Sequence, residues 1–128
     1  MRAGRLKRYR AVFAVAWAVW FLIVIAGSLL PGQVITAVAP AISDKAAHAI
    51  MYSGLALFPA LILESRWSLV LAAIAIMCTG LLLEAAQIRI PGRNADWSDV
   101  AWNVSGAILG WLASEGILLI ANGDATPR

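Results

Sequence analysis

The chain has 128 residues, of which 62% are hydrophobic and only 13% are charged. A soluble domain of this length cannot bury so much apolar surface, so a soluble fold is excluded and lipid must be the solvent for most of the chain. The single cysteine excludes an intrachain disulfide, and no nucleic-acid-binding motif is present. The net charge of +3 is unevenly spread, because five of the ten basic residues lie in the first ten positions.

Four apolar segments predict an all-α, polytopic membrane protein, a bundle of four transmembrane helices in one domain over residues 1–128. The first segment has twenty apolar residues, about 30 Å of helix, which matches one hydrocarbon thickness. A cleaved signal peptide is the rival interpretation, but Pro40 makes the small residues before it a poor cleavage site. The expected spans are 11–30, 46–63, 67–90 and 99–120.

Turn and cap signals separate these spans. The prolines and the glycine of residues 31–40 predict an irregular connection after the first span. Ser43 predicts the N-cap of the second span, and the pair Ser98 and Asp99 predicts a cap at the start of the fourth.

The basic residues predict how the chain is oriented. With the N-terminus in the cytoplasm, three basic residues lie outside, namely Lys45, Arg89 and Arg93. Seven basic residues on the cytoplasmic side against three outside satisfy the positive-inside rule, and both termini are then cytoplasmic. The seven inner residues are Arg2, Arg5, Lys7, Arg8, Arg10, Arg66 and Arg128.

Polar side chains gather on the outer halves of the last three spans at helical spacings of three and four, which place them on shared faces. The set comprises Asp44, His48 and Tyr52 on the second span, Glu84 and Gln87 on the third, and Asp99 and Asn103 on the fourth, where Gly106 and Gly110 continue the same stripe.

Glu84 is the most informative of these residues because of its depth. It lies sixteen residues after Ser68, about 24 Å along the helix, and therefore about 6 Å inside the outer boundary of the hydrocarbon layer. An unpaired carboxylate at that depth costs about 1–3 kcal/mol, so we expect a cationic partner or a bound proton. Lys45, Arg93 and His48 are the available partners, and we favour an arrangement in which Arg93 and Gln87 hold the Glu84 carboxylate.

The second and fourth spans both begin on the outer side, so two positive helix ends meet there beside Lys45 and Arg93. This arrangement suits an anion such as a phosphate. The region is nevertheless mixed in sign, because it also carries the carboxylates of Asp44, Glu84, Asp96 and Asp99.

The polar residues form an ordered pattern that resembles the VanZ-like membrane proteins. Its parts are Ser43-Asp44-Lys45-x-x-His48, then Glu84-x-x-Gln87, then Pro91-x-Arg93-x-x-Asp96-x-x-Asp99-x-x-x-Asn103-x-x-Gly106-x-x-x-Gly110. The family is named for an accessory protein of glycopeptide-resistance gene clusters that is linked to teicoplanin resistance. The resemblance implies a multi-pass protein of the bacterial plasma (inner) membrane with a role in the cell envelope. The residues it marks are Asp44, Lys45, His48, Glu84, Gln87, Arg93, Asp99 and Asn103.

Several of these residues also have a purely structural interpretation. Capping is the favoured role of Asp44 and Asp99, helix–helix contact that of Asn103, and an interfacial position that of Tyr52. His48 is balanced between a structural donor and a general acid or base. One histidine with scattered carboxylates is a weak case for zinc, so neither a metal nor a cofactor is expected.

Two functions remain open, and the sequence does not decide whether the protein is an enzyme. The first is a site for a lipid-linked or cell-wall phosphate or peptide, with Glu84 and His48 as acid and base. Its binding residues are Lys45, Arg93, Gln87, Asp44, Asp99 and Asn103. The second is a non-enzymatic scaffold that acts through a membrane partner or as a homo-oligomer. A transporter is a weaker third interpretation, since four spans without an inverted repeat offer little for a transport path.

Overall fold

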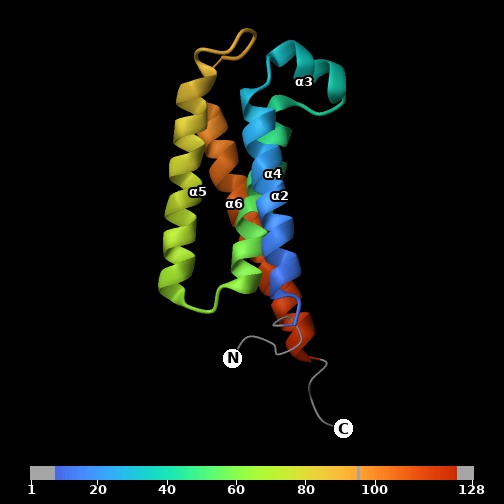
Figure 1. Ribbon diagram of the computed structural model, residues 1–128, viewed down its shortest axis with the longest axis vertical. Helices are drawn as coiled ribbons and strands as arrows, with labels where there is room; N and C mark the ends of the chain where they lie inside the picture. The colour runs from blue at the N-terminus through green and yellow to red at the C-terminus, as the bar shows by residue number, and fades with distance from the viewer. Residues whose placement is uncertain (1–7, 95, 124–128) are drawn as a thin grey trace.

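The computed structural model describes residues 8–94 and 96–123, with the backbone alone for 121–123. These residues form helices and contain no strand. The long helices α2 (Arg10–Leu29), α4 (Asp44–Ile62), α5 (Arg66–Gln87) and α6 (Trp97–Gly123) run lengthwise, and the short helix α3 (Gly32–Val38) lies at one end beside the loop of residues 88–94 (Figure 1).

The four long helices are each long and apolar enough to cross a membrane, so this is a multi-pass membrane protein. Their bounds agree with the expected spans to within three residues. The ends of the third and fourth spans differ most, by three residues each; the third ends at Gln87 because a turn starts at Ile88. Only 11–33% of the residues in each span are buried inside the protein, so most apolar side chains face lipid.

The connection after the first span is not wholly irregular, and that prediction is wrong in part. Residues 32–38 form α3, with Pro31 at its N-cap at a φ of −56°. Proline tolerates a helix start because its missing N–H would have no partner there, so the same residue that signals a break also starts a helix.

The predicted cap of α4 is confirmed, whereas the predicted cap of α6 is wrong. The Ser43 hydroxyl accepts a hydrogen bond from the N–H of Ala46 at 3.2 Å. At α6, the Asp96 carboxylate accepts from the backbone N–H of Ser98 at 2.9 Å and from its hydroxyl at 2.6 Å. The helix therefore begins at Trp97, and Ser98 and Asp99 lie inside its first turn.

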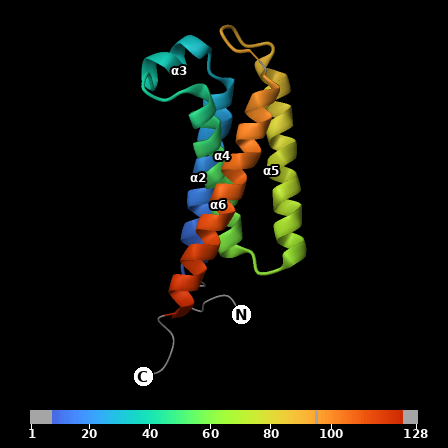
Figure 2. The same cartoon turned by 180° about the vertical axis from the view of Figure 1, so that it is seen from behind.

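The closest helix contact joins α4 to α6, which lie against each other along much of their length (Figure 2). Gly106 faces the backbone of Ala49, and Gly110 faces the backbone of Ser53. A methyl group at either glycine would overlap those backbone atoms. Small residues permit this approach, which is how helices pack in lipid without a hydrophobic driving force.

Helix α2 is fastened to α4 by two tryptophans. Nε1 of Trp17 donates to the carbonyl of Leu55 at 3.1 Å, and Nε1 of Trp20 donates to that of Met51 at 2.9 Å. The two indoles therefore act as packing residues between the helices. Tyr52, in contrast, is only 2% exposed and belongs to the core, so its predicted interfacial position is wrong.

The polar residues gather at the α3 end of the bundle, where α2 and α5 end and α4 and α6 begin (Figure 1). Arg10 and Arg66 lie at the other end, where α2 and α5 begin. Arg2, Arg5, Lys7 and Arg128, which the orientation argument also used, lie outside the described residues.

The glycine contact makes a prediction that a matched pair of variants can test. Gly106→Ala should lower the free energy of unfolding by about 1–3 kcal/mol, because the new methyl group forces α6 away from Ala49. Gly116→Ala should be neutral or stabilising, because no atom lies within 4 Å of the added carbon. Thermal unfolding in detergent micelles measures both, and equal effects would show that the contact is unimportant.

Candidate functional site

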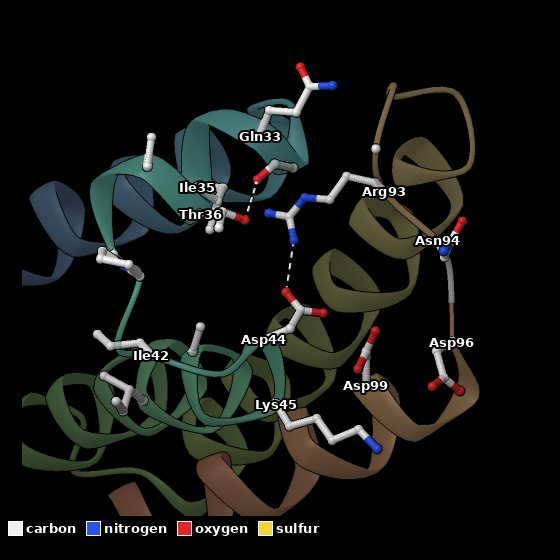
Figure 3. A pocket seen from close by; sticks show the side chains of 17 residues that line it. Gln33, Ile35, Thr36, Ile42, Asp44, Lys45, Arg93, Asn94, Asp96 and Asp99 are labelled. Atoms are coloured by element: carbon white, nitrogen blue, oxygen red, sulfur yellow. Dashed lines mark hydrogen bonds and ion pairs between the residues drawn. The ribbon is translucent and has the colours of Figure 1, made fainter.

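A cavity of about 950 Å³ opens at the α3 end of the bundle. Its wall is built by α3, the first turns of α4 and α6, and the loop before α6 (Figure 3). Charged side chains on that wall include Asp44, Lys45, Arg93, Asp96 and Asp99. Two stretches far apart in the sequence, within residues 32–50 and 92–99, therefore bring their polar residues to one place.

His48 is the centre of a buried polar cluster beneath this cavity. Its Nδ1 lies 2.8 Å from Oδ1 of Asn103 and 3.6 Å from Oε1 of Glu84. Its Nε2 lies 4.0 Å from Oδ2 of Asp44 and 4.0 Å from Oδ2 of Asp99. An amide oxygen only accepts hydrogen bonds, so Nδ1 of His48 carries a hydrogen and donates it to Asn103.

Glu84 is buried, at 8% exposure, and its partner is His48 rather than Arg93. The expected pairing of Glu84 with Arg93 is therefore wrong. Oε2 of Glu84 is buried with no hydrogen bond in the described part of the chain. Gln87 does not hold Glu84 either, because its amide donates to the carbonyl of Ser28 at 3.1 Å.

Arg93 joins the end of α2 to the start of α4. Its Nη2 donates to the carbonyl of Gly27 at 2.8 Å, and Nε points to that of Leu30 at 3.4 Å. Its Nη1 donates to Oδ1 of Asp44 at 2.9 Å, the ion pair drawn in Figure 3. The last carbonyls of a helix have no partner within it. The guanidinium therefore donates to two such carbonyls and also binds a carboxylate.

Two glycines bring Arg93 to this position. The N–H of Gly32 donates to the carbonyl of Pro91 at 3.3 Å, so the start of α3 contacts the loop that carries Arg93. A side chain at Gly32 would overlap the backbone of Gly92, and Gly92 itself has a φ of +75°, which favours glycine.

Lys45 lines the cavity and makes no ion pair within 4.0 Å in residues 8–94 and 96–123. The nearby Asp96 is exposed, and the Ser98 hydroxyl and N–H hold the pKa of its carboxyl below the ordinary value. Asp96 therefore stays ionised at neutral pH, and Lys45 is the cation that remains available to a ligand.

The structure thus divides the predicted site residues into two groups. Asp44, Lys45, Arg93 and Asp99 line the cavity, whereas His48, Glu84, Gln87 and Asn103 lie buried outside its lining. The favoured capping roles of Asp44 and Asp99 are wrong, because Ser43 and Asp96 accept the capping hydrogen bonds. Both aspartates lie in the first turn of their helix, where Asp44 binds Arg93 and Asp99 faces His48. The cross-helix bond predicted for Asn103 is present, and it reaches His48.

Sequence reasoning missed two contributors to the site. The carbonyls of Gly27, Ser28 and Leu30 receive Arg93 and Gln87, but backbone acceptors leave no signal in a sequence. Ile35 and Ile42 form an apolar wall of the cavity. Ile35 lies in the short apolar run between Gly32 and Pro40, which was assigned to an irregular connection, and Ile42 follows Pro40 just before the predicted cap at Ser43.

Four apolar spans with a polar cluster and a cavity at one end define a class of small multi-pass membrane proteins with a terminal polar site. The family model described as VanZ/LLP1 matches residues 6–119. The chain belongs to this family, as the sequence pattern indicated. Searches of curated proteins and of solved structures gave no match.

Arg93 generates a prediction that separates a structural role from a binding role. Arg93→Gln leaves the carbonyls of Gly27 and Leu30 without their donor, so the free energy of unfolding should fall by about 1–3 kcal/mol. Arg89→Gln, on the same loop but exposed, should have no effect. Thermal unfolding in micelles measures both, and an Arg93→Gln protein of normal stability would contradict the structural role.

Proposed function

We propose that the cavity binds the phosphate-bearing headgroup of a lipid-linked cell-envelope precursor at the outer leaflet of the bacterial plasma membrane. The observation that carries the proposal is the cavity itself, which combines an apolar wall with a charged wall at the end of a membrane-spanning bundle. An amphiphilic ligand needs both kinds of surface, because its headgroup and its first chain carbons must be accommodated together.

The apolar wall comes from the connection between α2 and α4. Ile35 and Ile42 line the cavity, and Figure 3 places both across from Asn94 and Asp96. Val38, at the end of α3, is 78% exposed, and so large an apolar exposure beside a membrane boundary suits contact with lipid. A lipid chain entering from the bilayer would meet this wall first.

The charged wall offers Lys45 as the principal contact for a phosphate. The three hydrogen bonds of Arg93 leave two of its five N–H groups for a ligand. The positive starts of α4 and α6 already have the Ser43 hydroxyl and the Asp96 carboxylate as acceptors, and Asp44 lies in the first turn of α4. Direct binding of the anion by bare helix ends, which the sequence suggested, is therefore a smaller contribution than Lys45.

The acid–base part of the proposal rests on the cluster beneath the cavity. Glu84 and His48 would serve as the acid and base, and both lie beneath Asp44 and Asp99 rather than on the cavity wall. The proposed role in glycopeptide susceptibility, including teicoplanin, rests on the cavity and this cluster together.

Lys45 provides the direct test of headgroup binding. Lys45→Ala should weaken the binding of undecaprenyl phosphate to the protein in nanodiscs about tenfold, because one charge-assisted contact is lost. Arg66→Ala, which removes a cation at the opposite end of the bundle, should bind like the wild-type protein. Native mass spectrometry measures the bound fraction, and equal binding by both variants would refute the assignment.

A non-enzymatic scaffold is the second candidate function, and the closed part of the network favours it. Arg93, Gln87 and Asn103 each form a hydrogen bond that joins two segments of the bundle. Such bonds would hold the helices in place with no ligand at all. In that case the protein would act on the envelope through a membrane partner or as a homo-oligomer.

Glu84→Gln separates the two candidates. If the cavity is a binding site, the variant should remain at wild-type abundance in the membrane while teicoplanin tolerance falls to that of cells without the protein, because the charge next to His48 is lost. A scaffold predicts that abundance and tolerance fall together. Glu115→Gln is the control, since its partner Trp111 lies in the far half of α6. Blotting and susceptibility assays measure the two quantities separately.

A further inference from the structure

The geometry points to a divalent metal site formed by Asp44, His48 and Asp99, of the kind that takes Zn²⁺ or Mn²⁺. One ligand atom from each residue lies within 4.8 Å of the other two. His48 Nε2 is 4.0 Å from each of the two carboxylates, which is too long for a hydrogen bond. A point between three such atoms lies about 2.5 Å from each. This distance is a few tenths of an ångström longer than the ~2.0–2.2 Å of zinc–nitrogen and zinc–oxygen bonds.

His48 is already oriented as a metal ligand. Its Nδ1–H is donated to Asn103 at 2.8 Å, with Glu84 Oε1 at 3.6 Å on the same side. A neutral imidazole held in this way presents the lone pair of Nε2 to the two aspartates. Ligating histidines typically donate their other ring N–H to a carbonyl or carboxylate, so Asn103 and Glu84 occupy the positions of supporting residues.

Asp99 supplies an independent reason to expect a cation. It is 3% exposed, and no hydrogen bond reaches its carboxylate from any described residue. A buried carboxylate without a donor is costly, particularly within a membrane-spanning helix. Asp99 lies at the cavity wall with Oδ2 turned toward His48 Nε2, so a cation between them would remove this cost.

A divalent ion would compensate the negative charges around His48. Asp44, Glu84 and Asp99 contribute three carboxylates, and Arg93 contributes one permanent positive charge. A divalent ion on a neutral His48 brings the cluster to electroneutrality, which is what a low-dielectric environment favours. One imidazole with two carboxylates is a donor set that suits Zn²⁺ or Mn²⁺.

The ion would have open coordination positions toward the cavity, because Asp44 and Asp99 both line it. A water molecule or a phosphate oxygen can take such a position. Coordination of a headgroup phosphate beside Lys45 rests on the proposed function. Binding of the ion itself does not.

The single histidine of the chain makes the wild-type protein its own probe. The protein would be expressed with ¹⁵N-histidine and purified in micelles with a tag that lacks histidine. EDTA would then remove any bound metal before the titration. Zn²⁺ should shift the Nε2 resonance, saturate at one ion per chain and leave Nδ1 protonated. An unchanged spectrum at excess Zn²⁺, with no loss of free Mn²⁺ signal in paramagnetic resonance, would overturn the site.

Variants identify the ligands. Asp99→Asn should weaken Zn²⁺ binding at least about tenfold, and Asn103→Ala about 10–100-fold through His48, as measured by calorimetry. Asp96→Asn is the matched control, because it removes a cavity carboxylate outside the cluster and asparagine still caps α6. Equal affinity of Asp99→Asn and Asp96→Asn would refute the assignment. If Asp99→Asn does not fold, the wild-type titration decides.

The metal alone and the lipid must be tested in separate arms. Absence of ion binding without lipid overturns the metal site, whatever the protein does with undecaprenyl phosphate. Ion binding without any lipid binding supports the metal site and overturns the proposed function. Lipid binding that EDTA abolishes and Zn²⁺ restores supports both.

Discussion

The approach of α6 to α4 is the contact on which the polar site depends. Gly106 lies against Ala49, the residue after His48, and Asn103 is one helical turn before Gly106. This register brings Asn103 within 2.8 Å of His48 and carries Asp99, one turn earlier, to the other side of the ring. The backbone contact therefore sets the chemistry, since a bulkier residue at Gly106 would separate the ring from both partners.

The lipid environment explains why these polar groups meet. A lone charge within a span is expensive, so a carboxylate such as Glu84 must find a polar neighbour inside the bundle. His48 of α4 is that neighbour for Glu84. Gln87 and Arg93 donate hydrogen bonds to backbone carbonyls near the end of α2. The result is a network of side-chain contacts between the helices, centred on His48, and an open cavity beyond it at the α3 end of the bundle. The first holds the helices, and the second is available to a ligand.

The combination of a closed network and an open cavity reconciles the two interpretations of this family member. Arg93 is a structural residue by its contacts, although it lies on the cavity wall. Lys45 lines the same wall and makes no ion pair within 4.0 Å among residues 8–94 and 96–123, so the proposed function gives it the binding role. Asp44 belongs to both groups, with one oxygen on Arg93 and the other facing His48.

The elements whose signals are local were predictable, and those that depend on distant backbone were not. Ser43 caps α4 as expected, because a hydroxyl acts on an N–H three residues away. Arg93 was assigned to the wrong partner. Its acceptors are the carboxylate of Asp44 and the carbonyls of Gly27 and Leu30, and a backbone carbonyl is a group that any residue carries. Tyr52 was placed at the interface, because the sequence does not show that Gly80 leaves room for its ring.

The sequence by itself determined four apolar spans, the family and the set of polar residues, because hydropathy and residue spacing are properties of single segments. Only the tertiary structure decided which of those residues meet. Asp44 and His48 share a face of α4, but Asp99 reaches them solely through the packing of α6. A site assembled across helices is set by their crossing and register, and neither quantity is written in any one helix.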